Sequence, residues 1–188
     1  MTTYSQPIHK NDEGLFNTQS GRLIDLLNPK PEMISLEDIA LSLSNYCRFG
    51  GHLTNHYSVA EHSILVWQLC PSSLKPAALL HDASEAYLGD VIKPLKNLLG
   101  KVYNELEDAW TKVIFEKYGV PLNDLIAVKE YDMKALELEH NYFRLGNMDL
   151  IEHQYDYRQE LGWYEKPYNQ YLKLLNFHFL QREISYKS

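Results

Sequence analysis

The sequence predicts an all-α fold with a short β or coil extension at its N-terminus. From Ser35 onward, apolar residues recur with the period of an amphipathic helix. Two capping boxes, Ser35 with Asp38 and Ser58 with Glu61, each precede an apolar run. No alternating pattern typical of strands follows Ser35. We therefore expect a single domain over residues 1–188, with residues 1–33 forming the extension.

Within the extension, residues 15–18 and 22–26 are apolar enough to pair as a short hairpin around Ser20-Gly21. The helical part then divides at its glycines and prolines. The stretch near residues 75–87 is small and apolar, which predicts a central buried helix. In the long helix that Asn123 caps, we expect core positions at Ile126, Leu136 and Leu138. The predicted helices cover residues 35 to about 48, 59–69, 75–87, 90–99 with an interruption at Pro94, 102–118, 123–143 and 169–183.

The composition excludes several classes of function. The chain has 188 residues, with 18 Lys and Arg against 25 Asp and Glu, which gives a formal net charge of −7. This balance argues against a nucleic-acid polymer as partner, because duplex binding usually needs a basic face. The two cysteines, Cys47 and Cys70, have no metal-binding spacing and predict a reducing, cytoplasmic location. No apolar run approaches the roughly 18 residues of a membrane span.

The adjacent residues His81 and Asp82 are the first candidates for metal chemistry. An imidazole nitrogen with a carboxylate oxygen suits a borderline divalent cation such as Mn, Fe, Co, Ni or Zn. His62 and Asp132, on neighbouring predicted helices, would complete a set of four ligands that leaves coordination positions open. Glu85 follows Asp82 at i+3, so it faces the same side of the helix, where a carboxylate can act as acid or base.

Taken singly, each of these residues also has an ordinary structural explanation. His62 alone fits a hydrogen-bonded core histidine, and Asp132 alone fits the surface of an acidic helix that includes Glu130, Glu137 and Glu139. Arg48 alone fits a charge at a helix C-terminus. Lys96 alone fits a solvated lysine. His81 and Asp82 are harder to explain this way, because charged residues are rarely buried in an apolar helix unless they are paired or bind a ligand.

Taken together, the segments resemble the HD-domain metal-dependent phosphohydrolases. The pattern consists of His62, the pair His81-Asp82 and the distant Asp132. Two strings resemble the 5′-deoxynucleotidase and deoxynucleoside triphosphate hydrolase branch, and small phage and prophage enzymes in particular: CRFGGHLTNHYSVAEHS and ALLHDASEAYLGDVIKPLK. The resemblance covers residues 24 to about 141.

The resemblance implies an HD-domain helical bundle with one divalent ion, Mn, Co, Fe, Ni, Mg or Zn, bound by His62, His81, Asp82 and Asp132. It implies that Arg48 and Lys96 bind phosphate oxygens, with Phe49 and His52 also at the substrate. Phe49 falls where the bacterial 5′-deoxynucleotidases carry a Trp against the sugar. Glu85 and Asp90 are the implied groups for proton transfer to or from water and the leaving group.

The expected function is hydrolysis of deoxynucleoside 5′-monophosphates to nucleoside and phosphate. Three alternatives stay open: release of tripolyphosphate from a deoxynucleoside triphosphate such as dATP, a phosphodiesterase using His52 and His56 at a second metal, and a non-catalytic nucleotide-binding regulator. Relatives in this family form dimers or larger rings, so a homo-oligomer is expected. An aromatic C-terminal run could supply its interface; the run comprises Tyr155, Tyr157, Tyr164, Tyr168 and Tyr171.

Overall fold

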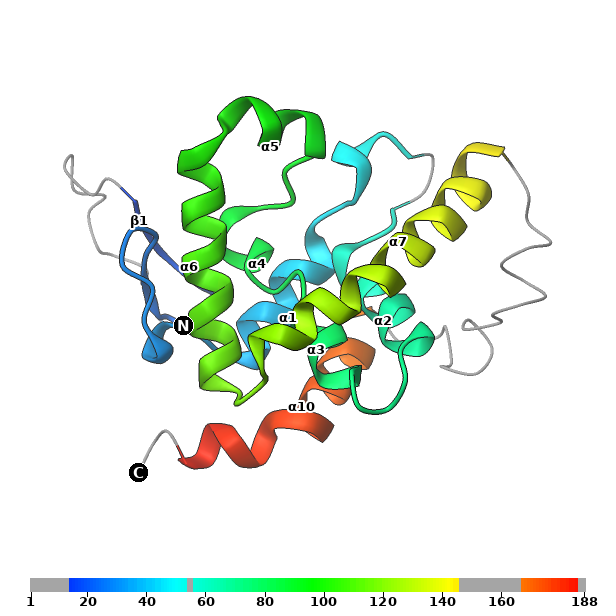
Figure 1. Ribbon diagram of the computed structural model, residues 1–188. Coiled ribbons are helices and arrows are strands. Elements are labelled where there is room, and N and C mark those ends of the chain that lie inside the picture. The colour runs from blue at the N-terminus through cyan, green and yellow to red at the C-terminus, as the bar shows by residue number, and fades with distance from the viewer. Residues whose placement is uncertain (1–13, 54–55, 146–166, 186–188) are drawn as a thin grey trace, which may run out of the picture.

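The computed structural model describes residues 14–53, 56–145 and 167–185. This part of the chain is mostly helical, with one two-stranded sheet at its side (Figure 1). The expected all-α architecture is confirmed at that level. Among the described helices, none combines the length and the apolar composition needed to cross a membrane.

The predicted N-terminal hairpin is confirmed. Strands β1 (Leu15–Asn17) and β2 (Leu23–Asp25) pair antiparallel, with Phe16 opposite Ile24. The side chain of Ile24 is fully buried. The indole Nε1 of Trp110 donates a hydrogen bond to the carbonyl of Leu26 at 3.1 Å. The hairpin is thereby attached to a helix some 80 residues further along the chain, with the one-turn helix η1 (Pro31–Met33) following it.

Helix α1 (Leu36–Asn45) begins where predicted but ends three residues early. Ser35 Oγ accepts from the amide of Asp38, whereas the Asp38 carboxylate turns to the hairpin and accepts from the amide of Ser20 at 3.1 Å. Only half of the expected capping box therefore forms. After Tyr46 the backbone is extended and Cys47 forms a β-bridge with Ser58. Arg48 consequently precedes the short helix η2 (Phe49–Gly51) instead of ending α1.

Helix α2 (Val59–Leu69) carries the complete capping box that the sequence predicts. Ser58 Oγ accepts from the amide of Glu61, while the Glu61 carboxylate accepts from the amide and hydroxyl of Ser58 at 2.7 Å. The first eight residues of α2 are buried, and the helix packs against α1, α3, α7 and α10. It is the central helix of the molecule.

The predicted helix over residues 75–87 is interrupted in its middle. Helix α3 (Lys75–Leu80) and helix α4 (Glu85–Leu88) are separated by a tighter turn at residues 81–84. There the amides of Ala83 and Glu85 bond three residues back, to Leu80 and Asp82. The backbone dihedrals at His81 remain helical. The apolar part of α3 is buried as expected, and the tight turn carries the His81-Asp82 pair.

Pro94 begins a helix instead of interrupting one. It lies in the first turn of α5 (Lys93–Leu99), where a missing amide hydrogen costs no helical hydrogen bond. Helix α6 (Lys101–Lys117) follows at Gly100 and packs against α5, α3 and η1. In Figure 1, α5 stands at the top of the molecule and α6 runs down beside the hairpin.

Helix α7 (Leu122–Leu145) crosses the molecule, and α10 (Pro167–Ser185) lies along its edge (Figure 1). Two core positions predicted for α7 were wrong, since Ile126 is 77% exposed and Leu136 is 36% exposed. The helix instead turns Val128 and Ala135 toward α2 and α3, because its contacts with those helices select that face. Helix α10 buries the predicted aromatic residue Tyr171, together with Leu175 and Phe179.

The capping box of α2 supports the central helix, and its loss is a direct test of the fold. Replacing Ser58 by Ala removes the cap for the Glu61 amide and the hydroxyl bond to the Glu61 carboxylate. We expect the free energy of unfolding to fall by about 1–2 kcal/mol in urea denaturation. The matched control is Ser73→Ala at an exposed position, which should change it by less than about 0.5 kcal/mol. Equal effects of the two changes would contradict this role.

Candidate metal centre

Four side chains from three elements converge at one point. His62 projects from α2, His81 and Asp82 from the turn after α3, and Asp132 from α7. His62 Nε2 lies 3.2 Å from His81 Nε2, 3.2 Å from Asp132 Oδ1 and 3.6 Å from Asp82 Oδ2. His81 Nε2 lies 3.1 Å from Asp82 Oδ2. We call these four residues the His-Asp cluster.

These separations match those within a metal coordination sphere. Ligand atoms held at about 2.0–2.2 Å from one ion lie roughly 2.8–3.6 Å from each other. One donor atom each of His62, His81 and Asp132 falls within 4.8 Å of the others, close enough to hold a metal ion. Asp82 lies outside this group of three, but its Oδ2 is near both histidines at the distances given above, which makes it the fourth candidate donor. Asp132, whose distance from the histidines the sequence leaves open, therefore lies close to His62 and His81.

The hydrogen bonds of the two imidazoles determine which nitrogen faces the cluster. His81 Nδ1 lies 2.8 Å from the carbonyl of Ala78, which can only accept, so Nδ1 carries the hydrogen. His62 Nδ1 lies 2.6 Å from Glu139 Oε1, which is likewise an acceptor. In the neutral rings, both Nε2 atoms then present lone pairs to each other and to two carboxylates. Such a convergence of four electron-pair donors requires a positive charge among them.

Glu139 is the site residue that sequence reasoning missed. Its buried carboxylate accepts from His62 Nδ1, from Tyr57 Oη at 3.0 Å and from Arg48 Nη2 at 2.8 Å. The sequence interpretation had placed it on the acidic surface of its helix. A signal was present, because Glu139 follows Asp132 by seven residues and so lies on the same face of α7. A carboxylate behind a histidine fixes the tautomer and the orientation of the ring.

The surroundings of His62 explain its protonation in the metal-free protein. Burial and Arg48 act to lower the pKa of His62, but Glu139 and Asp132 outweigh them and raise it to about 9. Burial would raise the pKa values of Asp82 and Asp132, yet the neighbouring histidines hold both well below their usual range. Both carboxylates are thus charged at neutral pH. A proton on His62 supplies the positive charge when no ion does.

Glu85, the predicted acid or base, is buried beside the cluster. Its Oε1 accepts from Lys96 Nζ at 3.0 Å, and its buried Oε2 has no hydrogen-bond partner among the described residues. Burial and the charge of Asp82 raise the pKa of Glu85 well above its ordinary value. Lys96 also donates to Glu107 Oε1 at 2.6 Å, a second carboxylate that the sequence did not single out. Burial likewise raises the pKa of Asp90, which is half-buried.

Arg48 faces the cluster from the loop before α2. Its Nη2 binds Glu139, its Nη1 lies 3.9 Å from Asp82 Oδ2, and its side chain is 12% exposed. The next residue, Phe49, has a positive φ of 56°. The centroid of its ring lies 5.4 Å from the guanidinium carbon of Arg48. His52 ends the short helix η2 and is exposed. Among the described residues, the group able to bind a metal includes neither His52 nor His56, so the second-metal alternative has no geometric support.

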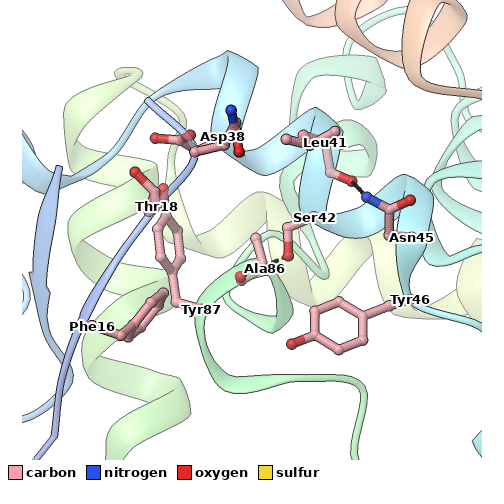
Figure 2. Close-up of a pocket in the computed structure, with 10 residues that line it drawn as sticks. Phe16, Thr18, Asp38, Leu41, Ser42, Asn45, Tyr46, Ala86 and Tyr87 are labelled. Carbon is pink, nitrogen blue, oxygen red and sulfur yellow. Dashed lines mark hydrogen bonds between the residues drawn. The ribbon is translucent and has the colours of Figure 1, made fainter. Parts of the chain in front are cut away.

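A separate hollow of about 310 Å³ lies between the hairpin and helices α1 and α4 (Figure 2). Phe16, Tyr46 and Tyr87 contribute its rings and Asp38 a carboxylate. None of the site residues predicted from the sequence lines it. The predicted aromatic residues Tyr155, Tyr157 and Tyr164 lie outside the described residues.

Comparison with known proteins gives relatives without a stated function. No model of a known protein family matches this chain. The uncharacterized protein YfdR of Escherichia coli is 48% identical over 106 residues, covering 56% of this chain and 59% of that protein. An uncharacterized protein of Rhodobacter capsulatus is 45% identical over 111 residues, covering 54% of this chain and 57% of that protein. The chain thus spans less than three fifths of the length of these curated relatives.

Glu139 is expected to determine how well the cluster holds an ion. Replacing it by Gln keeps the volume but allows an amide to donate to His62 Nδ1, which would move the ring hydrogen to Nε2. We expect Mn²⁺ or Co²⁺ affinity in calorimetric titration to fall by about 10- to 100-fold, the range typical when the hydrogen-bond partner of a metal-binding histidine is lost. The matched control is Glu137→Gln, an exposed carboxylate on the same helix. An unchanged affinity in the Glu139 variant would contradict the role assigned to it.

The protonation of His62 predicts how metal affinity depends on pH. Its pKa is raised to about 9 in the metal-free protein, so the protonated form dominates below that pH. An ion must displace this proton. The apparent affinity should therefore rise about tenfold per pH unit and level off near pH 9. Competition titrations with a chelator between about pH 6.5 and 9 measure this slope. An affinity that is constant over this range would exclude proton displacement from His62.

Proposed function

We propose that this protein is a metal-dependent phosphohydrolase of nucleotides, with deoxynucleoside 5′-monophosphates as the expected substrates. The observation that carries the proposal is the approach of His81 Nε2 and two carboxylates to His62 Nε2 at 3.2–3.6 Å, with Asp82 Oδ2 also 3.1 Å from His81 Nε2. The residues fit a divalent ion in number, chemistry and spacing. A bound ion lowers the pKa of water and offsets negative charge on phosphoryl oxygens.

The arrangement around the cluster supports catalysis more than mere structural binding. The four donors leave further coordination positions open, as catalytic sites require. Glu85 offers an oxygen that no described residue engages, and its raised pKa brings it toward the range in which a carboxyl group can both accept and give up a proton. In the proposed reaction, Glu85 takes a proton from the attacking water, and Asp90 is the second group available to the leaving oxygen.

In this proposal, the side chains of Arg48 and Lys96 bind the phosphate. Arg48 is held by Glu139 through Nη2, which leaves Nη1 directed at the cluster. Lys96 lies against Glu85 and Glu107 and is held between them. The guanidinium suits a fixed contact with two phosphate oxygens, and the ammonium acts as a point charge. Phe49 and His52, in the loop next to Arg48, are the proposed contacts for the sugar and base.

The test is a screen of the manganese-loaded protein against nucleoside mono-, di- and triphosphates, with both products identified. We expect inorganic phosphate from deoxynucleoside monophosphates; tripolyphosphate would favour the triphosphate alternative. Replacing His81 or Asp82 by Ala should lower kcat/KM by more than about 100-fold, since each supplies a donor to the ion. The matched control is His140→Ala, an exposed histidine outside the cluster, which should leave the rate unchanged.

Two results would count against the proposal. One is the absence of phosphate release from every nucleotide by protein that has bound the metal, which would favour the non-catalytic regulator. The other is a phosphatase rate that is the same in the wild type, the His81 variant and the Asp82 variant, because the activity would then come from elsewhere.

A further inference from the structure

The partly buried cations beside the His-Asp cluster are already paired with carboxylates. Asp82 and Asp132 balance a divalent ion, and Arg48 balances Glu139. Lys96 Nζ already binds two carboxylates, those of Glu85 and Glu107. Because these cations already have partners, a further cation close to the cluster would strengthen the binding of an incoming phosphate dianion.

Lys129 supplies a cation at that place. It lies one helical turn before Asp132 on α7, and its Nζ is 2.6 Å from Asp132 Oδ2. The other oxygen of the same carboxylate, Oδ1, is the atom that lies 3.2 Å from His62 Nε2. One carboxylate thus joins this ammonium directly to the cluster. The Lys129 side chain is 68% exposed, whereas those of Arg48 and Lys96 are 12% and 15% exposed.

We infer that Lys129 is a further substrate-binding residue, whose ammonium moves from Asp132 to the phosphate when a nucleotide binds. This inference rests on the proposed function and adds a determinant of affinity for it. A lysine suits the task because its ammonium is a compact charge on a flexible four-carbon stem. The bond to Asp132 is exposed and therefore weak, so exchanging it for a phosphate oxygen costs little. In the absence of substrate, Asp132 keeps the ammonium beside the cluster.

The same helix offers a matched control. Lys134 also forms a 2.6 Å ion pair within α7, with Glu130, and its side chain is 52% exposed. Glu130 does not belong to the group of residues able to hold an ion. Lys129→Ala and Lys134→Ala therefore remove the same charge and the same kind of exposed helical pair, but only the first change removes a cation next to the cluster.

The experiment compares wild type, Lys129→Ala and Lys134→Ala, each as the full chain loaded with manganese. Three quantities are measured: KM and kcat for a deoxynucleoside monophosphate, the dissociation constant of inorganic phosphate, and the dissociation constant of Mn²⁺ without phosphate. For Lys129→Ala we expect KM and the phosphate dissociation constant to rise about tenfold, the effect of losing one charged hydrogen bond near solvent. Its kcat and Mn²⁺ affinity should change by less than about twofold, and Lys134→Ala should match wild type.

The possible outcomes separate the inference from the proposed function. A Lys129→Ala variant with wild-type KM and phosphate affinity overturns the inference and leaves the proposed function intact. A loss of Mn²⁺ affinity of the same size as the rise in KM also overturns it, because Lys129 would then act only by positioning Asp132. Where the wild type hydrolyses no nucleotide, the proposed function fails, and the phosphate dissociation constants still decide whether Lys129 contacts the anion.

Discussion

Two imidazole nitrogens and two carboxylates with unshared electron pairs cannot occupy one partly buried space without a positive charge among them. This constraint governs the centre of the molecule. The carbonyl of Ala78 and the carboxylate of Glu139 hold the outer nitrogens of His81 and His62, so neither ring can turn its lone pair away. A metal ion or a proton must supply the positive charge among these donors. The surrounding helices keep these donors together despite their mutual repulsion.

The fold maintains this arrangement through buried links between distant segments. Glu139 on α7 joins α2 through His62 and the loop before α2 through Arg48 and Tyr57. In a second link, Lys96 of α5 joins Glu85 of α4 to Glu107 of α6. Breaking either link leaves a buried charge without its partner, which is costly in a medium of low polarity. The same contacts that stabilise the packing of these helices therefore also fix the geometry of the site.

Much of this was predictable from local sequence, and the remainder depends on tertiary contacts. The capping box at Ser58, the hairpin near residue 20 and most helix positions follow from short-range patterns. The interruption at residues 81–84 does not, because Ala83 and Glu85 are good helix formers and no glycine or proline marks the break. In the sequence, nothing close to Glu139 distinguishes it from the exposed acidic residues of the same helix. Its partners Arg48 and Tyr57 lie more than 80 residues away, so only the folded chain reveals why it is buried.

The central claim is that the His-Asp cluster binds one divalent ion, and the most direct measurement is the metal content of the purified chain. After loading with Co²⁺ and removal of the excess, we expect about one equivalent per chain in the wild type, and a visible absorption band from the bound cobalt. The double variant His81→Ala with Asp132→Ala should retain almost none. Less than about 0.2 equivalents in the wild type, or equal cobalt content in both proteins, would contradict the account.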